Sequence, residues 1–180
     1  ESDMLKNAAF YTMNDILGGQ FSARLNMNLR ENKHWAYGAY TSMRQAKGMR
    51  PYFAYAPVQT DKTKEAIAEV RKELRDYVSS RPSTQAELSK SVLNTVRSLP
   101  GEFETSTAVM GALTNIVMYN RPDNYVELIK PTYDKLTLGA VQQMANDVLK
   151  PEQMVWIVVG DLDKIETGVR NRTFGDDPLR

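Results

Sequence analysis

The sequence predicts an α+β fold, in which helices cover a single antiparallel or mixed β-sheet. Apolar residues at helical spacing occupy most of the 180-residue chain, and the few strand-like segments do not alternate regularly with them. A chain of this length is most simply one domain, residues 1–180, with a substantial core. The predicted sheet is thin, and the chain begins without methionine. We therefore expect a fragment whose first strands lie earlier in a longer protein.

The first elements are two helices separated by glycines. Apolar residues at helical spacing predict a helix over 4–17. Gly18 and Gly19 are expected to end it, because glycine readily adopts the left-handed conformation found at helix C-termini. Ser22 is then expected to cap a second helix that ends near Asn32.

A β-hairpin follows. Aromatic and small residues predict strands over 35–40, which includes Tyr37, and over 51–56, joined by a polar and basic segment. Two interpretations of the aromatic side chains stay open, the lining of a chamber for extended peptides and the core of the hairpin, and we favour the core. These side chains are Trp35, Tyr40, Tyr52, Phe53 and Tyr55.

The second half of the chain is mainly helical. Asp61 is expected to cap a helix that reaches Val78, and Thr84-x-x-Glu87 forms a capping box for the next one. Further helices are predicted over 105–118, 125–129 and 137–149. A turn is predicted at 130–131, directly after the second of these helices. The apolar run over 154–160 predicts a central strand that is buried on both faces.

The composition excludes several classes of site. There is no cysteine, so the chain offers no disulfide, thiolate zinc site or thiol nucleophile. A single histidine, His34, and the lack of an H-x-x-E-H motif exclude zinc catalysis by this chain alone. The net charge of +1 does not favour nucleic acid as a partner. The lack of a long apolar run does not favour insertion into a membrane.

One motif resembles a known family. Residues 17–25 read Leu-Gly-Gly-x-Phe-Ser-x-Arg-Leu, and Leu-Arg-Glu and Ala-Tyr-Gly follow. This pattern resembles the insulinase/pitrilysin family of zinc metallopeptidases, which includes the mitochondrial processing peptidase. The resemblance covers 4–163, since the last helix and the Gly-Asp after 155–159 match the end of the family's domain. It implies a metallopeptidase-like α/β sandwich domain.

The resemblance also implies a function. In that family two homologous domains face each other around a chamber, and only one of them carries the zinc motif. The other, inactive domain supplies an arginine and a tyrosine seven residues apart, which match Arg30 and Tyr37 here. The implied roles are a substrate anchor for Arg30 and a hydrogen-bond donor to the substrate carbonyl or oxyanion, acting in trans, for Tyr37.

The resemblance further implies that this chain alone is inactive and holds no cofactor. Zinc is expected in a homologous partner domain or subunit, and an extended peptide is the expected substrate. We expect a periplasmic or otherwise exported protein, while a cytoplasmic or organellar location stays open. A different function is also open, in which the chain is a structural or peptide-binding module without a role in catalysis.

The corner between Arg30 and Tyr37 departs from the family's pattern. The family commonly has glycine and leucine where this chain has His34 and Trp35, so His34 is expected to adopt a backbone conformation that glycine adopts freely. We interpret His34 itself as a polar corner residue. Structural alternatives remain for the other two: Arg30 as the stabiliser of a helix C-terminus, and Tyr37 as an ordinary strand tyrosine.

Overall fold

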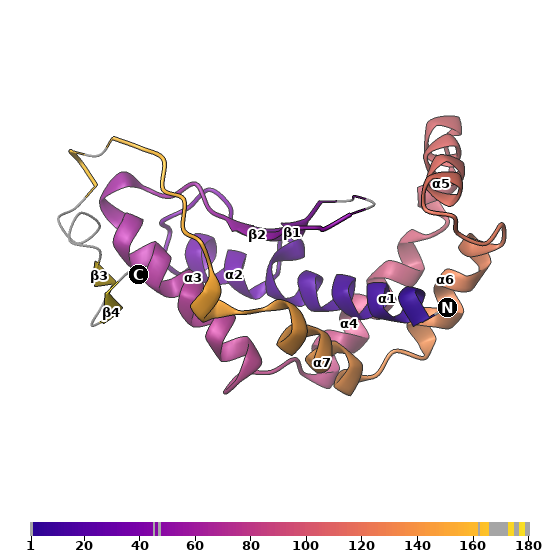
Figure 1. Ribbon diagram of the computed structural model, residues 1–180, viewed down its shortest axis with the longest axis horizontal. Coiled ribbons are helices and arrows are strands. Elements are labelled where there is room, and N and C mark those ends of the chain that lie inside the picture. Colours follow the sequence, from indigo (N-terminus) through magenta and orange to yellow (C-terminus); the bar gives the residue numbers. More distant parts are fainter. Residues whose placement is uncertain are drawn as a thin grey trace.

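Helix α1 (Ser2–Asn14) runs through the middle of the molecule and continues as one π-helical turn, η1 (Asp15–Gly19) (Figure 1). The structure is a computed structural model that describes residues 2–44, 46, 48–161, 163–165, 173–174 and 177–178. The remaining helical elements are α2 (Arg24–Asn26), η2 (Met27–Asn32), η3 (Thr60–Lys62), α3 (Thr63–Val78), α4 (Gln85–Ser98), η4 (Gly101–Phe103), α5 (Ser106–Met118), α6 (Tyr125–Asp134), α7 (Leu138–Val148) and η5 (Pro151–Gln153). The strands are β1 (Tyr40–Met43), β2 (Tyr52–Tyr55), β3 (Thr173–Phe174) and β4 (Asp177–Pro178).

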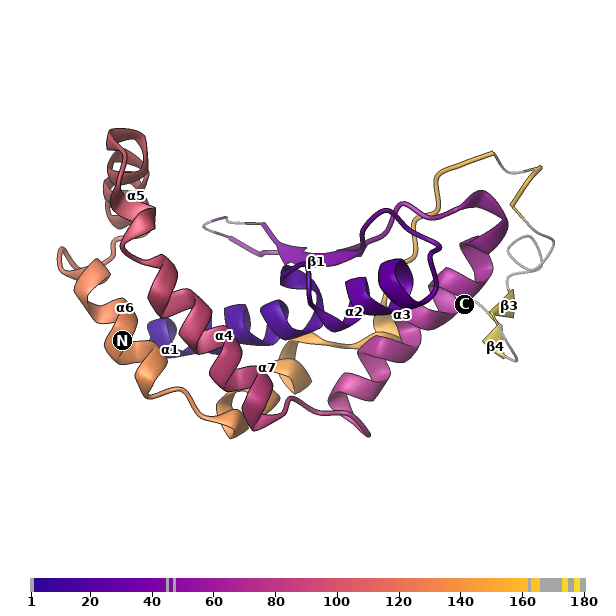
Figure 2. The ribbon, with the colours of Figure 1, turned by 180° about the vertical axis from the view of Figure 1, so that it is seen from behind.

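The core forms around α1. Helix α7 packs along it, α4 and α6 contact it as well, and the β1–β2 hairpin lies on the other side (Figures 1 and 2). The largest fully buried apolar side chains are Met13, Leu17, Leu25, Leu29, Leu74, Tyr77 and Val141. Helix α5 projects from one end of the molecule (Figure 2). This arrangement confirms the predicted α+β class, and none of its described helices is both long and apolar enough to cross a bilayer.

The hairpin is antiparallel as predicted, but its first strand begins later than expected. Strand β1 starts at Tyr40, opposite Tyr55, and residues 35–39 contribute only one isolated bridge, from Ala36 to Val58. The predicted strand over 35–40 is therefore wrong, and Tyr37 lies in a loop. The physical reason is a side chain: Asn26 Oδ1 accepts the backbone N–H of Ala39 at 3.0 Å, so that N–H is not available to a strand partner.

The aromatic residues of the hairpin divide between its two faces, since side chains alternate along a strand. Trp35 and Tyr52 pack against the core, in agreement with the favoured interpretation. Tyr40, Phe53 and Tyr55 are exposed on the outer face, so the core interpretation is wrong for these three.

Three of the predicted helix starts agree with the structure. Thr84 forms the predicted capping box with Glu87, and Thr105 and Thr137 accept the backbone N–H three residues on. The two other predicted caps are wrong. Ser22 Oγ instead accepts a hydrogen bond from Lys90 Nζ at 2.8 Å, and Asp61 lies within the 3₁₀ turn that precedes α3.

Helix α6 continues past the turn predicted at Lys130 and Pro131. Pro131 lies inside the helix, which ends at Asp134. A proline in a helix interior removes one backbone hydrogen bond. Tyr133, two residues later in the same helix, packs against the core.

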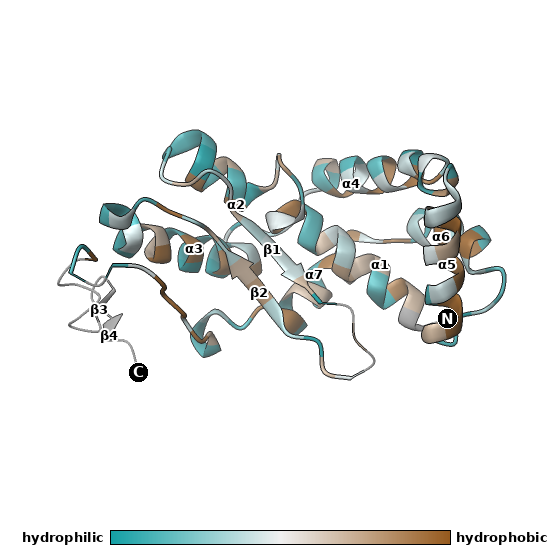
Figure 3. Cartoon of the chain, turned by 90° about the horizontal axis from the view of Figure 1, so that it is seen from above, coloured by the Kyte–Doolittle hydropathy of each residue, from teal (hydrophilic) through white to brown (hydrophobic). Residues whose placement is uncertain are grey.

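Residues 154–160 do not form the buried central strand that their composition predicts. The segment is extended (Figure 1), and the described part of the chain provides it with no strand partner. Trp156 packs against the core, whereas Val155, Ile157 and Val159 are 86%, 85% and 92% exposed. In Figure 3 this apolar stretch lies apart from β2. The prediction fails because a strand is buried on both faces only where its sheet continues around it.

Gly18 has a different role from the one predicted. Both glycines lie in the π-helical turn, and neither adopts the left-handed conformation expected from the sequence. A Cβ atom at Gly18 would instead lie 2.5 Å from Thr41 Oγ1 and 2.6 Å from Thr41 N. The residue is small because the end of the first helix touches the backbone of β1.

We predict that Gly18→Ala lowers the free energy of unfolding by about 1–3 kcal/mol, the usual cost of overpacking. Urea denaturation measures this loss. Gly111→Ala is the matched control, because the added Cβ on α5 meets no atom within 4 Å. That control should raise stability by about 0.5–1 kcal/mol, the helical advantage of alanine over glycine. Equal effects of the two substitutions would contradict the close contact at Thr41.

Candidate functional site

The structure brings Arg30 and Tyr37 together at one corner of the molecule. Arg30 lies in η2, and its Cζ atom is 5.4 Å from the centroid of the Tyr37 ring. A third residue joins them: the ring of Phe21 has its centroid 4.6 Å from the same Cζ atom. Both rings are therefore within cation–π distance of one guanidinium.

This cluster faces solvent. Tyr37 is 87% exposed and Phe21 is 63% exposed, and the Arg30 side chain retains 34% of its accessible surface. The Glu31 carboxylate lies 3.3 Å from Arg30 Nε, as a neighbour along the chain. A guanidinium carries five N–H donors and a phenol carries one O–H donor. The corner can thus donate hydrogen bonds outward to carbonyl or carboxylate oxygens of a bound molecule.

His34 forms the corner between the two residues, and its φ of 58° confirms the predicted glycine-like conformation. Its N–H donates to the Arg30 carbonyl at 3.2 Å, and the N–H of Trp35 donates to the Leu29 carbonyl at 3.0 Å. These bonds end η2 and turn the chain sharply toward Tyr37. The His34 carbonyl accepts a hydrogen bond from Gln59 Nε2 at 3.2 Å, so the backbone of this residue is held by the loop after β2.

Asn26 connects the two loops that carry the aromatic rings. Its buried side chain donates from Nδ2 to the Phe21 carbonyl at 2.7 Å and accepts at Oδ1 from the Ala39 N–H at 3.0 Å. A buried amide that satisfies backbone groups on two loops fixes the distance between them. Asn26 therefore links the loop of Phe21 to the loop that carries Tyr37, and both rings lie near Arg30.

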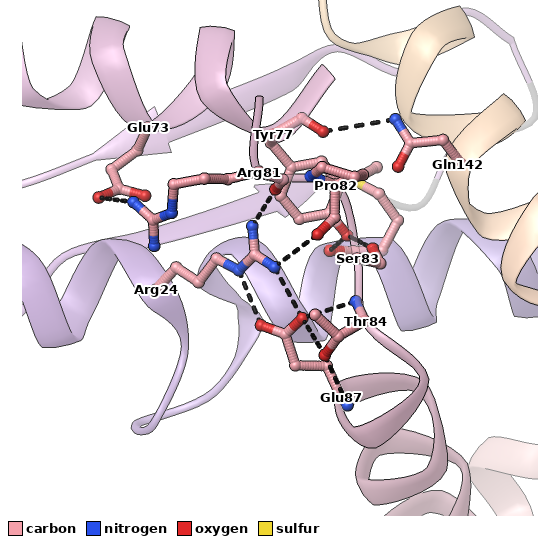
Figure 4. Close-up of polar contacts among 10 residues, drawn as sticks. Arg24, Glu73, Tyr77, Arg81, Pro82, Ser83, Thr84, Glu87 and Gln142 are labelled. Atoms are coloured by element: carbon pink, nitrogen blue, oxygen red, sulfur yellow. Dashed lines mark hydrogen bonds and ion pairs between the residues drawn. The ribbon is translucent and has the colours of Figure 1, made fainter. Parts of the chain in front are cut away.

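Arg24 anchors the same region to the helices (Figure 4). Its Nε and Nη2 atoms donate to the two carboxylate oxygens of Glu87, both at 2.7 Å. Its Nη1 also donates to the Arg81 carbonyl, and Nη2 donates to the Pro82 carbonyl at 2.9 Å. A bidentate pair of this kind fixes orientation as well as distance. It ties the start of α2 to the α3–α4 turn and to the first turn of α4.

The surroundings of Arg24 explain two pKa shifts. Burial raises the pKa of Glu87, but the hydrogen bonds from Arg24 and Thr84 outweigh it, so the pKa is lower overall. Burial raises the pKa of Tyr77, whose ring lies 5.0 Å from Arg24 Cζ, to about 12. Both groups keep their ordinary charge at neutral pH, and this network has a structural role.

Sequence reasoning missed Phe21 and Asn26. Phe21 belongs to the Leu-Gly-Gly-x-Phe-Ser-x-Arg-Leu pattern of residues 17–25, and its place there, next to the predicted cap Ser22, is the sign of it in the sequence. Asn26 stands between Leu25 and Leu29, which both face the core, and a polar residue on a buried face is a sign of an internal hydrogen bond.

The residues do not fit a resident zinc ion. Zinc sites need three or four Cys, His or carboxylate ligands converging on one point. Over the described ranges no three such side chains lie close enough together to hold a metal. The chain has one histidine and no cysteine. No step at this site is therefore assigned to a metal bound by this chain.

Comparison with known families identifies the N-terminal half of the chain. A family model described as the peptidase M16 inactive domain matches residues 3–94, which include the whole Phe21, Arg30 and Tyr37 cluster. Comparison with curated proteins gives no match.

Solved structures extend the likeness to most of the chain. A peptidase M16 inactive domain from Pseudomonas fluorescens is 26% identical, with a TM-score of 0.70 over 81% of this chain and 34% of that one. A protease from Helicobacter pylori is 20% identical, with a TM-score of 0.71 over 82% of this chain and 35% of that one. This chain thus spans about a third of either structure. The inactive peptidase domain from Bordetella parapertussis, assigned to a zinc protease, is 18% identical, with a TM-score of 0.67 over 81% of this chain and 79% of that one.

We predict that Arg24→Ala lowers the free energy of unfolding by about 3 kcal/mol, because it leaves the Glu87 carboxylate and two backbone carbonyls without their donor. Thermal or urea unfolding measures the change. Lys72→Ala removes an exposed pair with Asp76 and should stay within about 0.5 kcal/mol of the parent chain. A loss at Arg24 no larger than that of the control would refute its anchoring role.

Proposed function

Since the chain belongs to the family of peptidase M16 inactive domains, we propose that it is the non-catalytic half of a zinc metallopeptidase. In this proposal it completes the active site of a homologous partner that carries the zinc. The partner is either another domain of the same polypeptide or a separate subunit. The substrate is an extended peptide that lies between the two halves.

The observation that carries this proposal is the exposed cluster at the corner. An arginine within cation–π distance of two aromatic rings is restricted in its orientation while its donors stay accessible. Tyr37 is 87% exposed, which is unusual for a residue whose only role is packing. Such an arrangement suits contact with a molecule outside the chain better than it suits stabilisation of the fold.

Each residue has a defined task in the proposal. Arg30 donates to a carbonyl or carboxylate oxygen of the peptide and so fixes its register. Tyr37 donates its O–H to the carbonyl oxygen at the bond to be cleaved, where negative charge develops. Phe21 and Asn26 position these two side chains. The metal, its ligands and the general base belong to the partner.

A periplasmic or exported location is part of the proposal. One structural neighbour, at 15% identity and a TM-score of 0.61, is the periplasmic protease PqqL from Escherichia coli. The lack of cysteine is compatible with an oxidising compartment.

We predict that Tyr37→Phe lowers kcat for peptide cleavage by about 100-fold or more when the zinc-bearing partner is present, the usual effect of losing one oxyanion donor. Arg30→Ala should lower kcat/KM by about 10- to 100-fold through lost hydrogen bonds to substrate. Tyr40→Phe, which removes a hydroxyl from an exposed tyrosine of β1, is the matched control and should leave cleavage unchanged.

The same measurement separates the proposal from its alternative. If the cognate pair cleaves peptide at parental rates with both variants, Arg30 and Tyr37 have no part in catalysis. A separate outcome, in which the pair of parental proteins binds peptide but does not cleave it, would identify the chain as a structural or peptide-binding module.

We also predict that Phe21→Ala lowers kcat/KM by about 2- to 5-fold, the equivalent of one exposed cation–π contact. The loss should appear mainly in KM, because the ring positions Arg30 and does not touch the reacting atoms. Phe21→Tyr retains the ring and should restore the parental value. If Phe21→Tyr lowers kcat/KM as much as Phe21→Ala does, the cause is packing in the loop and not the cation–π contact.

A further inference from the structure

A cavity of about 820 Å³ lies where the start of α1, the β1–β2 hairpin, the turn after α5 and helix α7 meet. In Figure 2 the hairpin extends above α1 in the direction of α5. Sites for small molecules usually have volumes of about 300–1,000 Å³, so this cavity is of a suitable size. Its described lining residues do not include Phe21, Arg30 or Tyr37, so it is separate from the exposed cluster at the corner.

The inner wall of the cavity is apolar. Phe10 of α1 is buried in the core, and Val148 of α7 packs against the same core. Methionines from four different elements complete this wall, namely Met4, Met43, Met118 and Met144. Methionine is flexible and polarisable, and it adapts its shape to an apolar ligand. This wall therefore suits a flexible aliphatic chain.

Three cationic side chains line the same cavity, Lys6, Arg50 and Arg121, and none of its described lining residues is acidic. The net charge of the whole chain is only +1, so this excess of one sign is a local property. Arg50 Nη2 donates to a neutral group, Asn7 Oδ1, at 3.4 Å. Cations that face a cavity without a carboxylate in its lining raise the local concentration of anions.

The way in which α5 ends directs Arg121 to this cavity. Asn120 has a φ of 50°, and the N–H of Arg121 donates to the Ile116 carbonyl at 2.9 Å. A left-handed residue with this hydrogen bond is the Schellman arrangement of a helix end. Arg121 Cζ then lies 4.3 Å from the ring centroid of Tyr125 and 5.2 Å from that of Tyr119. Aromatic contacts do not consume the N–H donors of a guanidinium, so these donors can bind an oxygen ligand.

We infer that this cavity binds a single-chain amphiphile with an anionic head, of which a free fatty acid is the simplest. The carboxylate lies among Lys6, Arg50 and Arg121, and the aliphatic tail lies against the methionines. Arginine suits this head because its donors match the two oxygens of a carboxylate. An extended peptide is a poorer match, because it needs a row of backbone partners and most of the described lining residues belong to helices and turns. The inference does not depend on the proposed function.

Isothermal titration calorimetry on the full-length protein with octanoate, decanoate and dodecanoate tests the inference. We expect one site per chain and an affinity that rises about 3-fold with each added methylene, because each one buries a similar apolar surface. Decanol has a tail of the same length without the charge, and it should bind at least about 10-fold more weakly than decanoate. An affinity that does not depend on chain length would overturn the inference.

Variants test the cationic side of the cavity. Arg121→Gln should lower the affinity for dodecanoate by about 10-fold and leave the affinity for decanol unchanged. Lys6→Gln, at an exposed position of α1, should act in the same direction, so the test does not rest on one variant. Arg97→Gln removes the same charge from an exposed position of α4 that does not line the cavity, and it should leave both affinities unchanged. Equal losses with Arg97→Gln and Arg121→Gln would overturn the inference.

Three further results would also overturn it. Binding of many dodecanoate molecules per chain would indicate the action of a detergent. Binding to phosphatidylglycerol vesicles, without binding of dodecanoate below its micellar concentration, would assign the cations to a membrane surface. If none of the three acids binds to the full-length protein, other parts of that protein fill the cavity.

Discussion

The bidentate contact between Arg24 and Glu87 is the interaction on which the rest of the structure most depends. It joins the start of α2 to the first turn of α4, and the two residues are 63 positions apart in the chain. The loop with Phe21 precedes Arg24, and η2 with Arg30 follows it, so the exposed cluster takes its orientation from this pair. Side chains on loops keep a precise position only where rigid elements support the loops, and this ion pair supplies such support.

The sequence predicts most of the helices, and the reason is local. The capping threonines at 84, 105 and 137 each bond a backbone N–H three residues on, a contact that sequence spacing alone determines. Ser22 and Asp61 carry the same chemistry, yet Ser22 is engaged by Lys90, which lies far along the chain. The tertiary fold decides which of several possible caps is used.

In the candidate site, too, local features are predictable from the sequence and features that depend on the tertiary fold are not. The approach of Arg30 and Tyr37 is predictable, since a helix end and a left-handed corner at His34 fix their relation over seven residues. The strand assigned to Tyr37 was wrong because Asn26 captures the N–H of Ala39 from another element. Phe21 and Asn26 make their contacts only once the two loops are folded together, so the sequence offers only indirect signs of them.

The exposed run over 154–159 also bears on how the protein is made. Met-Val-Trp-Ile-Val-Val combines high β-propensity with no charge and no proline, the composition of segments that stack into intermolecular sheets. If its edge were exposed before the protein folds, this segment would pair with the same segment of other copies and cause aggregation. The ribosome delivers this segment after every helix that packs beneath it. Because the segment is synthesised after these helices, the time during which it is exposed without a folded surface to pack against is short.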